Sequence, residues 1–594
     1  MNDTTATTAT TTESETETEI WDSVVVGLGG VGSFALRALA KSCNNEEEDD
    51  GSGPSFVGQR RRRQRRYLGI EQFSPGHHYG SSHGKLRAYR RAYFEHPNYV
   101  PWIQYSLEQF RQLEKTQNVS LVCPTGILMV QEQQRQRQQE ENHDSDAGSQ
   151  SQQSQSQQQQ QQKLPTYIQK SYDSAMEHNI PIQIIQSMEE LKRRFPFLNL
   201  EDYSSVKDES FVGMLEPDGG YIRCEKAIAA ALQEAQSYPE NITIWDNTIV
   251  VPSSIKETMI DSDPDANEGT RTERPLVQLT VRRRERKGPV DDGSSQEVEE
   301  TITSTILARS VLIAGGAWTP SLIPSWSKYL SVTRQLQGWI NININDNNNN
   351  DDDDNSSSSS WTDDEDGDDD NAYTNDQNRE KNTSRIQMFQ PDHMPVWFLS
   401  TSKYPLPIYG MPCDPLDDDD RAKYWLKVAI HGRTSEMLSL DDDPLRNSKD
   451  VSSEELKELQ DAIKCALHPI VWKQKKKNKL HRNPSRLSSD DIDIDDHDYG
   501  DDTLPTLVHV EPCMYTVTPD ENFLIGTPDD GVCHHEAVFA VGGLSGHGFK
   551  MVPALGQMLA DFALGRHNVV DHWGASFCSP TRFATEATTS TTKE

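Results

Sequence analysis

Apolar residues gather in short runs along this chain, and several of these runs end at glycines. Val24-Val25-Val26 predicts a buried strand, and the apolar positions between Ser33 and Ser42 predict a helix soon after it. Further runs predict strands at 67–70, 310–314 and 538–541 and helices at 102–115 and 554–564. Because strand, glycine turn and helix recur at both ends, we expect one α/β domain assembled from distant segments, with a second domain inserted between them.

Long polar stretches, rich in Gln, Asn, Asp, Ser or charged residues, separate these runs. They cannot bury enough apolar surface to offset the entropy lost when a chain becomes ordered. We therefore expect disordered insertions at 44–66, 131–163, 284–300, 341–384 and 484–503, a disordered tail at 1–20 and a second tail at 571–594.

Composition excludes several classes of function. The chain has 594 residues and a formal net charge of −35, which disfavours binding to nucleic acid or to an anionic membrane. No apolar run reaches the length of about 18 residues that predicts a membrane span. The eight cysteines lack the spacing of a metal site or a disulfide framework, so we expect no metal and a reducing environment. Because no secretory or C-terminal peroxisomal signal is found, we expect a soluble intracellular protein, cytoplasmic or peroxisomal.

The first predicted strand and helix are joined by the motif G-x-G-x-x-G, at Gly27, Gly29 and Gly32. Such glycines allow a tight turn, close approach of the backbone to a pyrophosphate, and packing of the helix on the strand. Glu71 follows the second predicted strand, where a carboxylate would accept hydrogen bonds from an adenosine ribose. Its spacing approaches the usual value of about 20 residues once 44–66 are set aside. The pattern predicts a bound dinucleotide without separating FAD from NAD.

Six motifs elsewhere resemble the family of monomeric sarcosine oxidase, N-methyltryptophan oxidase and pipecolate oxidase, which are D-amino-acid-oxidase-like flavoproteins. They are SHGKLRAYR at 82–90, TGIL at 125–128, EPDGG at 216–220, GGAW at 315–318, CMYTVTPD at 513–520 and GLSGHGFK at 543–550. The resemblance implies that the dinucleotide is FAD, bound covalently through a thioether to Cys513. It further implies that the flavin site includes His83, Arg87, Gly546, His547, Gly548 and Phe549.

The same resemblance implies a substrate site. Arg90 and Lys550 would hold the carboxylate of an amino acid. Two further motifs, PIYGMP at 407–412 and LKVAIH at 426–431, imply that Tyr409 and His431 line the substrate pocket. They also imply that Lys427 lies near flavin N5, where an ammonium stabilises the superoxide formed when O2 is reduced. The alternation of Leu426, Val428 and Ile430 should place Lys427, Ala429 and His431 together on the opposite face of a strand.

The sequence departs from the family pattern at two places. Lys85-Leu86 stands where the family has Asp-Thr, which adds a positive charge beside the flavin motif. The loop between Met411 and Leu426 contains Asp417–Asp420 and is longer than in the family, which leaves the position of the hairpin open.

These observations predict a Rossmann-like FAD-binding domain from 21–126, 205–335 and 505–570. An α+β substrate domain with a mixed or antiparallel sheet is predicted from 164–204 and 385–483. The predicted function is FAD-dependent oxidation of a secondary or primary amino acid, such as an N-methyl amino acid, to an imine, with O2 reduced to H2O2 by a monomer. Alternatives are an amine dehydrogenase with another acceptor, a pipecolate or fructosyl-amino-acid oxidase, an NAD dehydrogenase, or a flavin-binding assembly protein.

Overall fold

The computed structural model describes twelve segments of the chain, and the statements below concern these residues. They are 19–45, 64–133, 164–200, 210–258, 276–287, 298–342, 386–432, 437–438, 450–471, 504–528, 537–566 and 568–583. Within them no helix is long and apolar enough to cross a membrane.

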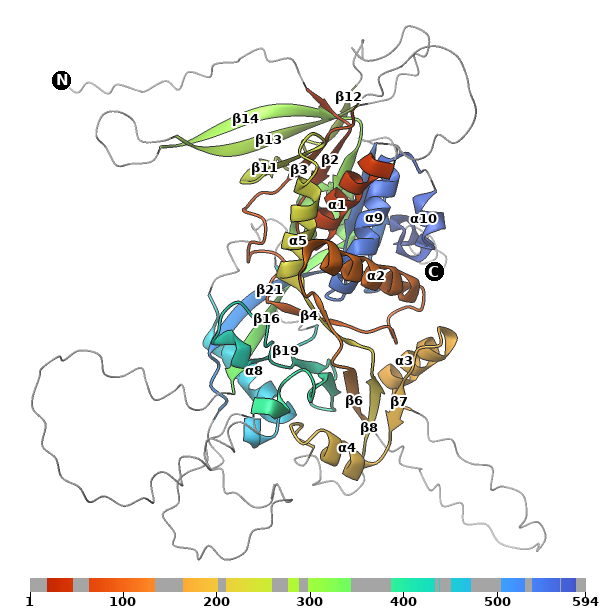
Figure 1. Cartoon of the computed structure of the whole chain (residues 1–594), viewed down its shortest axis with the longest axis vertical. Coiled ribbons are helices and arrows are strands. Elements are labelled where there is room, and N and C mark those ends of the chain that lie inside the picture. Colours follow the sequence, from red (N-terminus) through yellow and green to blue (C-terminus); the bar gives the residue numbers. More distant parts are fainter. Residues whose placement is uncertain are drawn as a thin grey trace, which may run out of the picture.

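A six-stranded, mainly parallel sheet forms the centre of one half of the molecule (Figure 1). Its order is β10 (Ile242–Trp245), β3 (Tyr67–Ile70), β2 (Ser23–Val26), β15 (Val311–Ile313), β23 (Val538–Gly542) and β22 (Leu524–Gly526). Only β22, at the edge, runs antiparallel to its neighbour. Strands from three distant parts of the sequence therefore lie side by side, as the repeated strand–glycine–helix pattern predicts.

Helices pack on this sheet and on one another. They are α1 (Gly30–Asn45), α2 (Tyr99–Gln117), α5 (Cys224–Gln236) and α9 (Val552–Ala563), and α1 contacts both α5 and α9. Gly556 permits the close approach of α9, because a Cβ there would lie 2.6 Å from the backbone nitrogen of Ala35. Helices α1 and α9, from opposite ends of the sequence, thus share one apolar core.

A nine-stranded mixed sheet forms the other half of the molecule (Figure 1). Its order is β20 (Met437–Leu438), β16 (Ser331–Asn341), β19 (Trp425–Ile430), β18 (Ile408–Met411), β17 (Val396–Ser400), β6 (Ile127–Gln133), β8 (Ser210–Glu216) and β7 (Gln183–Ile185). The ninth strand, β21 (His509–Val517), also pairs with β16. Helices α3 (Thr166–Glu177), α4 (Met188–Arg194) and α8 (Ser453–Ala466) accompany this sheet.

Two smaller sheets complete the fold. One contains β4 (Leu86–Tyr89), β9 (Gly220–Arg223) and β5 (Val122–Cys123). The other contains β1 (Ile20–Trp21), β14 (Val298–Ala308), β13 (Leu276–Lys287), β11 (Thr248–Val250) and β12 (Lys256–Thr258). The predicted fold class, α/β with a second domain built on a mixed sheet, is confirmed.

The sheets divide the chain differently from the predicted boundaries. Strands β8 and β21 lie within the segments predicted for the FAD-binding domain, and β6 lies outside both predicted domains. Strand β16 begins in a predicted FAD-binding segment and continues beyond it. All four strands belong to the nine-stranded sheet. An apolar run predicts that a strand is buried, but it does not specify which of two sheets the strand joins.

Some predicted insertions and tails are also shorter than expected. Residues 284–287 and 298–300 extend the β13–β14 hairpin, in which the two strands pair their backbone groups with each other. Ile20 pairs with Leu307 in β1, and within the predicted tail at 571–594 residues 576–578 and 580–583 form short helical turns that pack Cys578 against the core. The ends of three other insertions join α1, β6 and β16, at 44–45, 131–133 and 341. Residues 484–503 lie outside the described segments.

Candidate active site

The glycine turn lies between β2 and α1, at the carboxyl end of the parallel sheet. Gly27 has a φ of +88°, and a Cβ there would lie 2.6 Å from the carbonyl oxygen of Ala314 at the end of β15. A Cβ on Gly32 would lie 1.8 Å from the carbonyl oxygen of Gly27. Both positions therefore require glycine, and the close contact aims the N-terminus of α1 at the space above the sheet.

Glu71, directly after β3, holds this turn in shape. Its buried carboxylate accepts hydrogen bonds from the backbone N–H of Leu28 at 2.8 Å and of Phe73 at 3.2 Å. Ser82 supports the turn from the other side, since its Oγ accepts from the N–H of Gly30 at 3.2 Å. Each carboxylate oxygen has a further lone pair, so Glu71 can also accept a hydrogen bond from a ligand.

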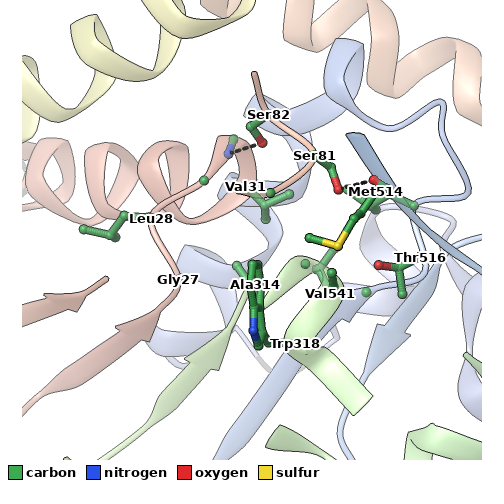
Figure 2. A pocket seen from close by; sticks show the side chains of 18 of the residues that line it. Gly27, Leu28, Val31, Ser81, Ser82, Ala314, Trp318, Met514, Thr516 and Val541 are labelled. Carbon is green, nitrogen blue, oxygen red and sulfur yellow. Dashed lines mark hydrogen bonds between the residues drawn. The ribbon is translucent and has the colours of Figure 1, made fainter. Parts of the chain in front are cut away.

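A cavity of about 220 Å³ opens above the turn. Figure 2 shows its walls: Leu28 and Val31 come from the turn and α1, Ala314 and Trp318 from the end of β15, and Met514 and Thr516 from β21. Among its lining residues, the sequence analysis assigned no role to Ser81, Ser82, Trp318, Met514 or Thr516. Their positions depend on how distant segments meet, although four of the five lie within the recognised motifs and Ser81 lies directly before one.

A second, smaller cavity of about 70 Å³ adjoins the first. Arg87, Tyr515, Gly546 and Phe549 line both cavities. The residues that border only the second include Arg90, Glu95, Tyr409, His431, Cys513, His547 and Lys550. The structure therefore gathers nearly all the predicted substrate residues around one enclosed space, next to the glycine turn.

Cys513, His83 and Glu511 form a buried cluster at the junction. Strand alternation puts Glu511 and Cys513 on the same face of β21, and His83 Nδ1 lies 3.2 Å from Glu511 Oε2. Burial opposes the charged form of His83, but Cys513 and Glu511 raise the pKa of this histidine to about 9. Burial likewise opposes a thiolate, yet His83 and Arg87 lower the pKa of Cys513. The thiol is thus held in an environment that favours its nucleophilic form.

His78 extends this cluster, with its Nδ1 2.7 Å from Glu511 Oε1. Within the described segments, His78, His83 and Glu511 are the three residues whose donor atoms lie close enough together to hold a metal ion. Burial opposes ionisation of Glu511, but its interactions with His83 and His78 lower the pKa of this carboxyl to about 2.

Arg90 and Lys550, which were predicted to hold a carboxylate, both line the second cavity, but Arg90 is already paired. Its NH2 group donates to both carboxylate oxygens of Glu95, at 2.6 and 2.8 Å, and NH1 donates to Ala92. Lys550 Nζ donates to the carbonyl oxygen of His547 at 2.7 Å and to the hydroxyl of Tyr93 at 3.2 Å. Burial and the charge of Arg90 lower the pKa of Lys550 to about 7. Glu95 was missed because no sequence pattern marks a carboxylate that faces inward from a loop.

Two histidines complete the second cavity in neutral form. Burial lowers the pKa values of His431 and His547 to about 4. His547 Nδ1 lies 2.6 Å from the hydroxyl of Tyr93, so this residue, predicted to bind the cofactor, contributes to the wall of the second cavity. Near neutral pH both rings can accept or donate hydrogen bonds without adding charge.

The hairpin of β18 and β19 keeps the predicted alternation. Leu426 and Val428 are buried in one apolar cluster and Ile430 packs against it, while Ala429 and His431 line the second cavity, which Ile430 also borders. Lys427 shares the face of Ala429 and His431 but lines neither cavity: its buried Nζ donates to the carbonyl oxygens of Gly84 at 2.6 Å and Leu86 at 3.0 Å. Burial and the charge of Arg87 lower the pKa of Lys427 to about 7.

The residues around the two cavities fit an FAD. The glycine turn, the α1 N-terminus and Glu71 suit an ADP moiety, and the cavity continues past them to the Cys513 cluster. Gln337 Nε2, at the edge of the second cavity, is buried and has no hydrogen-bond partner among the described residues, which leaves a donor for a ligand. A redox-active ring joined to that ADP moiety would reach the second cavity.

Comparison with known proteins agrees with this geometry. Residues 22–252 match the family model described as FAD dependent oxidoreductase. The monomeric sarcosine oxidase of Streptomyces avermitilis is 23% identical over 552 residues, covering 92% of this chain and 94% of that protein. The N-methyl-L-tryptophan oxidase of Salmonella dublin is 47% identical over 64 residues, 11% of this chain and 16% of that protein. The open form of NikD, "an unusual amino acid oxidase essential for nikkomycin biosynthesis", shares the fold, with a TM-score of 0.53, 17% identity and coverage of 92% and 95%.

The buried cluster predicts that Glu511 controls the reactivity of Cys513. In Glu511→Gln, His83 loses an anionic neighbour, so the pKa of His83 should fall and the pKa of the Cys513 thiol should rise. Alkylation of Cys513 by iodoacetamide in the cofactor-free protein, followed by peptide mass spectrometry at neutral pH, should become slower. Cys123, which is remote from Glu511, is the internal control, and equal rates at Cys513 in both proteins would contradict the assignment.

Proposed function

We propose that this chain, which belongs to the family of FAD-dependent oxidoreductases, oxidises a small amino acid at the carbon that bears its amine. The proposed substrate is a secondary or primary amino acid of the N-methyl type, the acceptor is O2, and the products are an imine and H2O2. The observation that carries this proposal is the second cavity, where Arg90 and Lys550 face two neutral histidines beside the cofactor space.

The charges of the second cavity support binding of one carboxylate. Three N–H donations from Arg90 go to Glu95 and Ala92, which leaves two of the five guanidinium N–H groups for a ligand. Arg90 is neutralised by Glu95, whose pKa is kept low by Arg90 even though burial opposes its ionisation. Lys550 supplies the remaining positive charge, so an amino acid's carboxylate would balance the site.

The same charges favour an amine in its neutral form. An amine must lose its proton before it can give up a hydride, and nearby cations lower its pKa. His431 is neutral at this wall and can accept a hydrogen bond without competing as a base of high pKa. The volume of the second cavity, about 70 Å³, supports a small substrate over a fructosyl amino acid.

When bound, FAD supplies the acceptor for the two electrons and the hydrogen that leave the amine carbon. The chain's own contribution to the second half-reaction is Lys427. Its ammonium is fixed by two carbonyl oxygens on the face that Ala429 and His431 present to the cavity. A fixed cation stabilises the negative charge that develops when an electron passes to O2.

The test of the proposed reaction is an anaerobic titration of the purified yellow protein with sarcosine, pipecolate, proline and simple amines. At least one amino acid should bleach the flavin absorbance, and admission of O2 should restore the colour and release one H2O2 for each substrate oxidised. Bleaching that only an artificial acceptor reverses would identify a dehydrogenase. No bleaching by any amine would contradict amine oxidation altogether.

Covalent attachment of FAD predicts that the yellow colour survives acid precipitation. After proteolysis, the flavin should remain on the peptide that contains Cys513, because a thioether withstands denaturation. Cys513→Ala should release all its flavin into the supernatant, whereas Cys123→Ala, a matched change of a distant thiol, should retain it. Release of free flavin from the unmodified protein would show that the cofactor is not covalent.

Lys427→Met should slow reoxidation by O2 roughly 100-fold while leaving anaerobic reduction by substrate nearly unchanged, since it removes one fixed charge from the O2 step. In the unmodified protein the ammonium is present below the pKa of about 7, so the reoxidation rate should fall as pH rises through that value. Stopped-flow absorbance measures both steps. Lys423→Met, on the same hairpin but paired with exposed Asp420, is the matched control.

A rate of reoxidation that neither Lys427→Met nor pH changes would remove Lys427 from the mechanism.

A further inference from the structure

The loop between β18 and β19 leaves its own sheet and reaches the three-stranded sheet and α5. We call residues 414–420 of this loop the acidic strap. Its three ion pairs with the neighbouring elements are Asp414 with Arg223, Asp417 with Lys85, and Asp418 with Lys226. The acidic residues of this loop therefore make specific contacts with two other parts of the fold.

Asp414 anchors the base of the strap. Its carboxylate accepts from Arg223 Nε at 2.7 Å and from NH2 at 2.6 Å, and from the hydroxyl of Tyr221 at 3.1 Å. Both side chains of the ion pair are buried. A two-point pair of this kind fixes the orientation of the carboxylate as well as its position.

Asp417 connects the strap to the turn that precedes β4. Both its carboxylate oxygens lie 2.8 Å from Lys85 Nζ, and the Asp417 side chain is only 10% exposed. Lys85 has a φ of +62°, a conformation that side chains rarely adopt. The two departures from the family pattern, Lys85 and the lengthened acidic loop, thus bind each other.

The backbone of the turn formed by Gly84, Lys85 and Leu86 is hydrogen-bonded to residues of α5 and β19. The N–H groups of Gly84 and Lys85 donate to Glu225 Oε1 at 2.9 and 3.2 Å. The N–H of Cys224 donates to the carbonyl oxygen of Lys85 at 3.0 Å. The carbonyl oxygens on either side of Lys85, those of Gly84 and Leu86, receive the two hydrogen bonds from Lys427 Nζ.

We propose that the acidic strap is a positioning device for Lys427: the Lys85–Asp417 pair fixes the turn whose two carbonyl oxygens hold the Lys427 ammonium. This inference rests on the proposed role of Lys427 in the reaction with O2. The strap and Lys427 belong to the same hairpin. This hairpin therefore holds the turn in two ways: Asp417 binds the side chain of Lys85, and Lys427 binds the backbone carbonyl oxygens on either side of it. Lys85 and Asp417 touch no reacting atoms and act only through Lys427.

Loss of the pair weakens the ligation of the ammonium. The charged and titratable groups that face Lys427 are Arg87 on β4, Cys224 on α5, and Glu511 and Cys513 on β21. Two carbonyl oxygens favour the ammonium over the neutral amine, and a turn that moves no longer presents both at once. The Lys427 ammonium should then lose its proton at lower pH. The rate of the reaction with O2 should therefore fall over a lower pH range than in the unmodified protein.

The first experiment compares Asp417→Asn with Asp420→Asn, which removes the same charge from an exposed position of the strap. Hydrogen–deuterium exchange of the cofactor-free, full-length protein should show exchange roughly fivefold faster at residues 84–86 and Cys224 in Asp417→Asn, as expected for loss of a partly exposed ion pair. Asp420→Asn should match the unmodified protein. Equal exchange in all three proteins would overturn the proposal without involving the cofactor.

The second experiment uses rescue and a pH profile in the flavin-loaded protein. Asp417→Asn should react with O2 roughly tenfold more slowly at pH 8, and the midpoint of its rate-against-pH curve should lie at lower pH. The double change Lys85→Asp with Asp417→Lys restores the pair, and Asp tolerates a positive φ better than most residues. It should recover both the rate and the midpoint, and an unrecovered double variant would overturn the proposal.

The outcomes also separate this inference from the proposed function. If Lys427→Met leaves reoxidation unchanged while Asp417→Asn accelerates exchange at 84–86, the strap still fixes the turn, but Lys427 does not serve the reaction with O2. If Lys427→Met slows reoxidation while exchange at 84–86 is unaffected by Asp417→Asn, the proposed function stands and the strap has no positioning role.

Discussion

The register of one strand, β16, determines where the reactive side chains lie. It pairs with β21 on one side and β19 on the other, so that Gln335 lies opposite Cys513 and Trp339 lies opposite Lys427. Because side chains alternate along a strand, a slip of one residue in either pairing would turn Cys513 or Lys427 into the apolar cluster on the other face. The buried leucine, valine and isoleucine side chains of that cluster therefore fix the position of the polar residues that face the cavities.

Charge balance is the second constraint, because these polar residues are almost completely buried. Arg90 is paired with Glu95, His83 with Glu511, and Arg223 with Asp414. Removing one member of a buried pair leaves an uncompensated charge and typically destabilises a protein by about 3–5 kcal/mol. Lys427 and Lys550 are not paired in this way; carbonyl oxygens hold them, and burial lowers both pKa values to about 7. The charge of each of these two lysines can therefore change near neutral pH.

Local sequence patterns predicted the glycine turn and the face of the hairpin that carries Lys427, because both depend on neighbouring residues of the chain. The glycine turn was predictable because Gly27 and Gly32 have no room for a side chain, and the hairpin face of Lys427 followed from alternation alone. Glu95, Glu511 and Ser82 were not predicted, since each acts on a partner from another segment and lies in no periodic pattern. The predicted domain boundaries differ from the observed sheets for a related reason. The apolar residues of β6, β8 and β21 indicate strands, but they do not indicate which of the two sheets each strand joins.

The aspartates of the acidic strap differ sharply in their surroundings. Aspartates in a run are normally solvated, and Asp420 remains so at 92% exposure. Three residues earlier, Asp417 is 10% exposed and bound to Lys85, a residue that alone would have been an uncompensated charge beside the flavin motif. A longer loop and a lysine in an unfavourable backbone conformation each weaken the fold when considered separately. Joined by one ion pair, they tie the hairpin of the nine-stranded sheet to the turn before β4, and through that turn they support the side chain on which the reaction with O2 is proposed to depend.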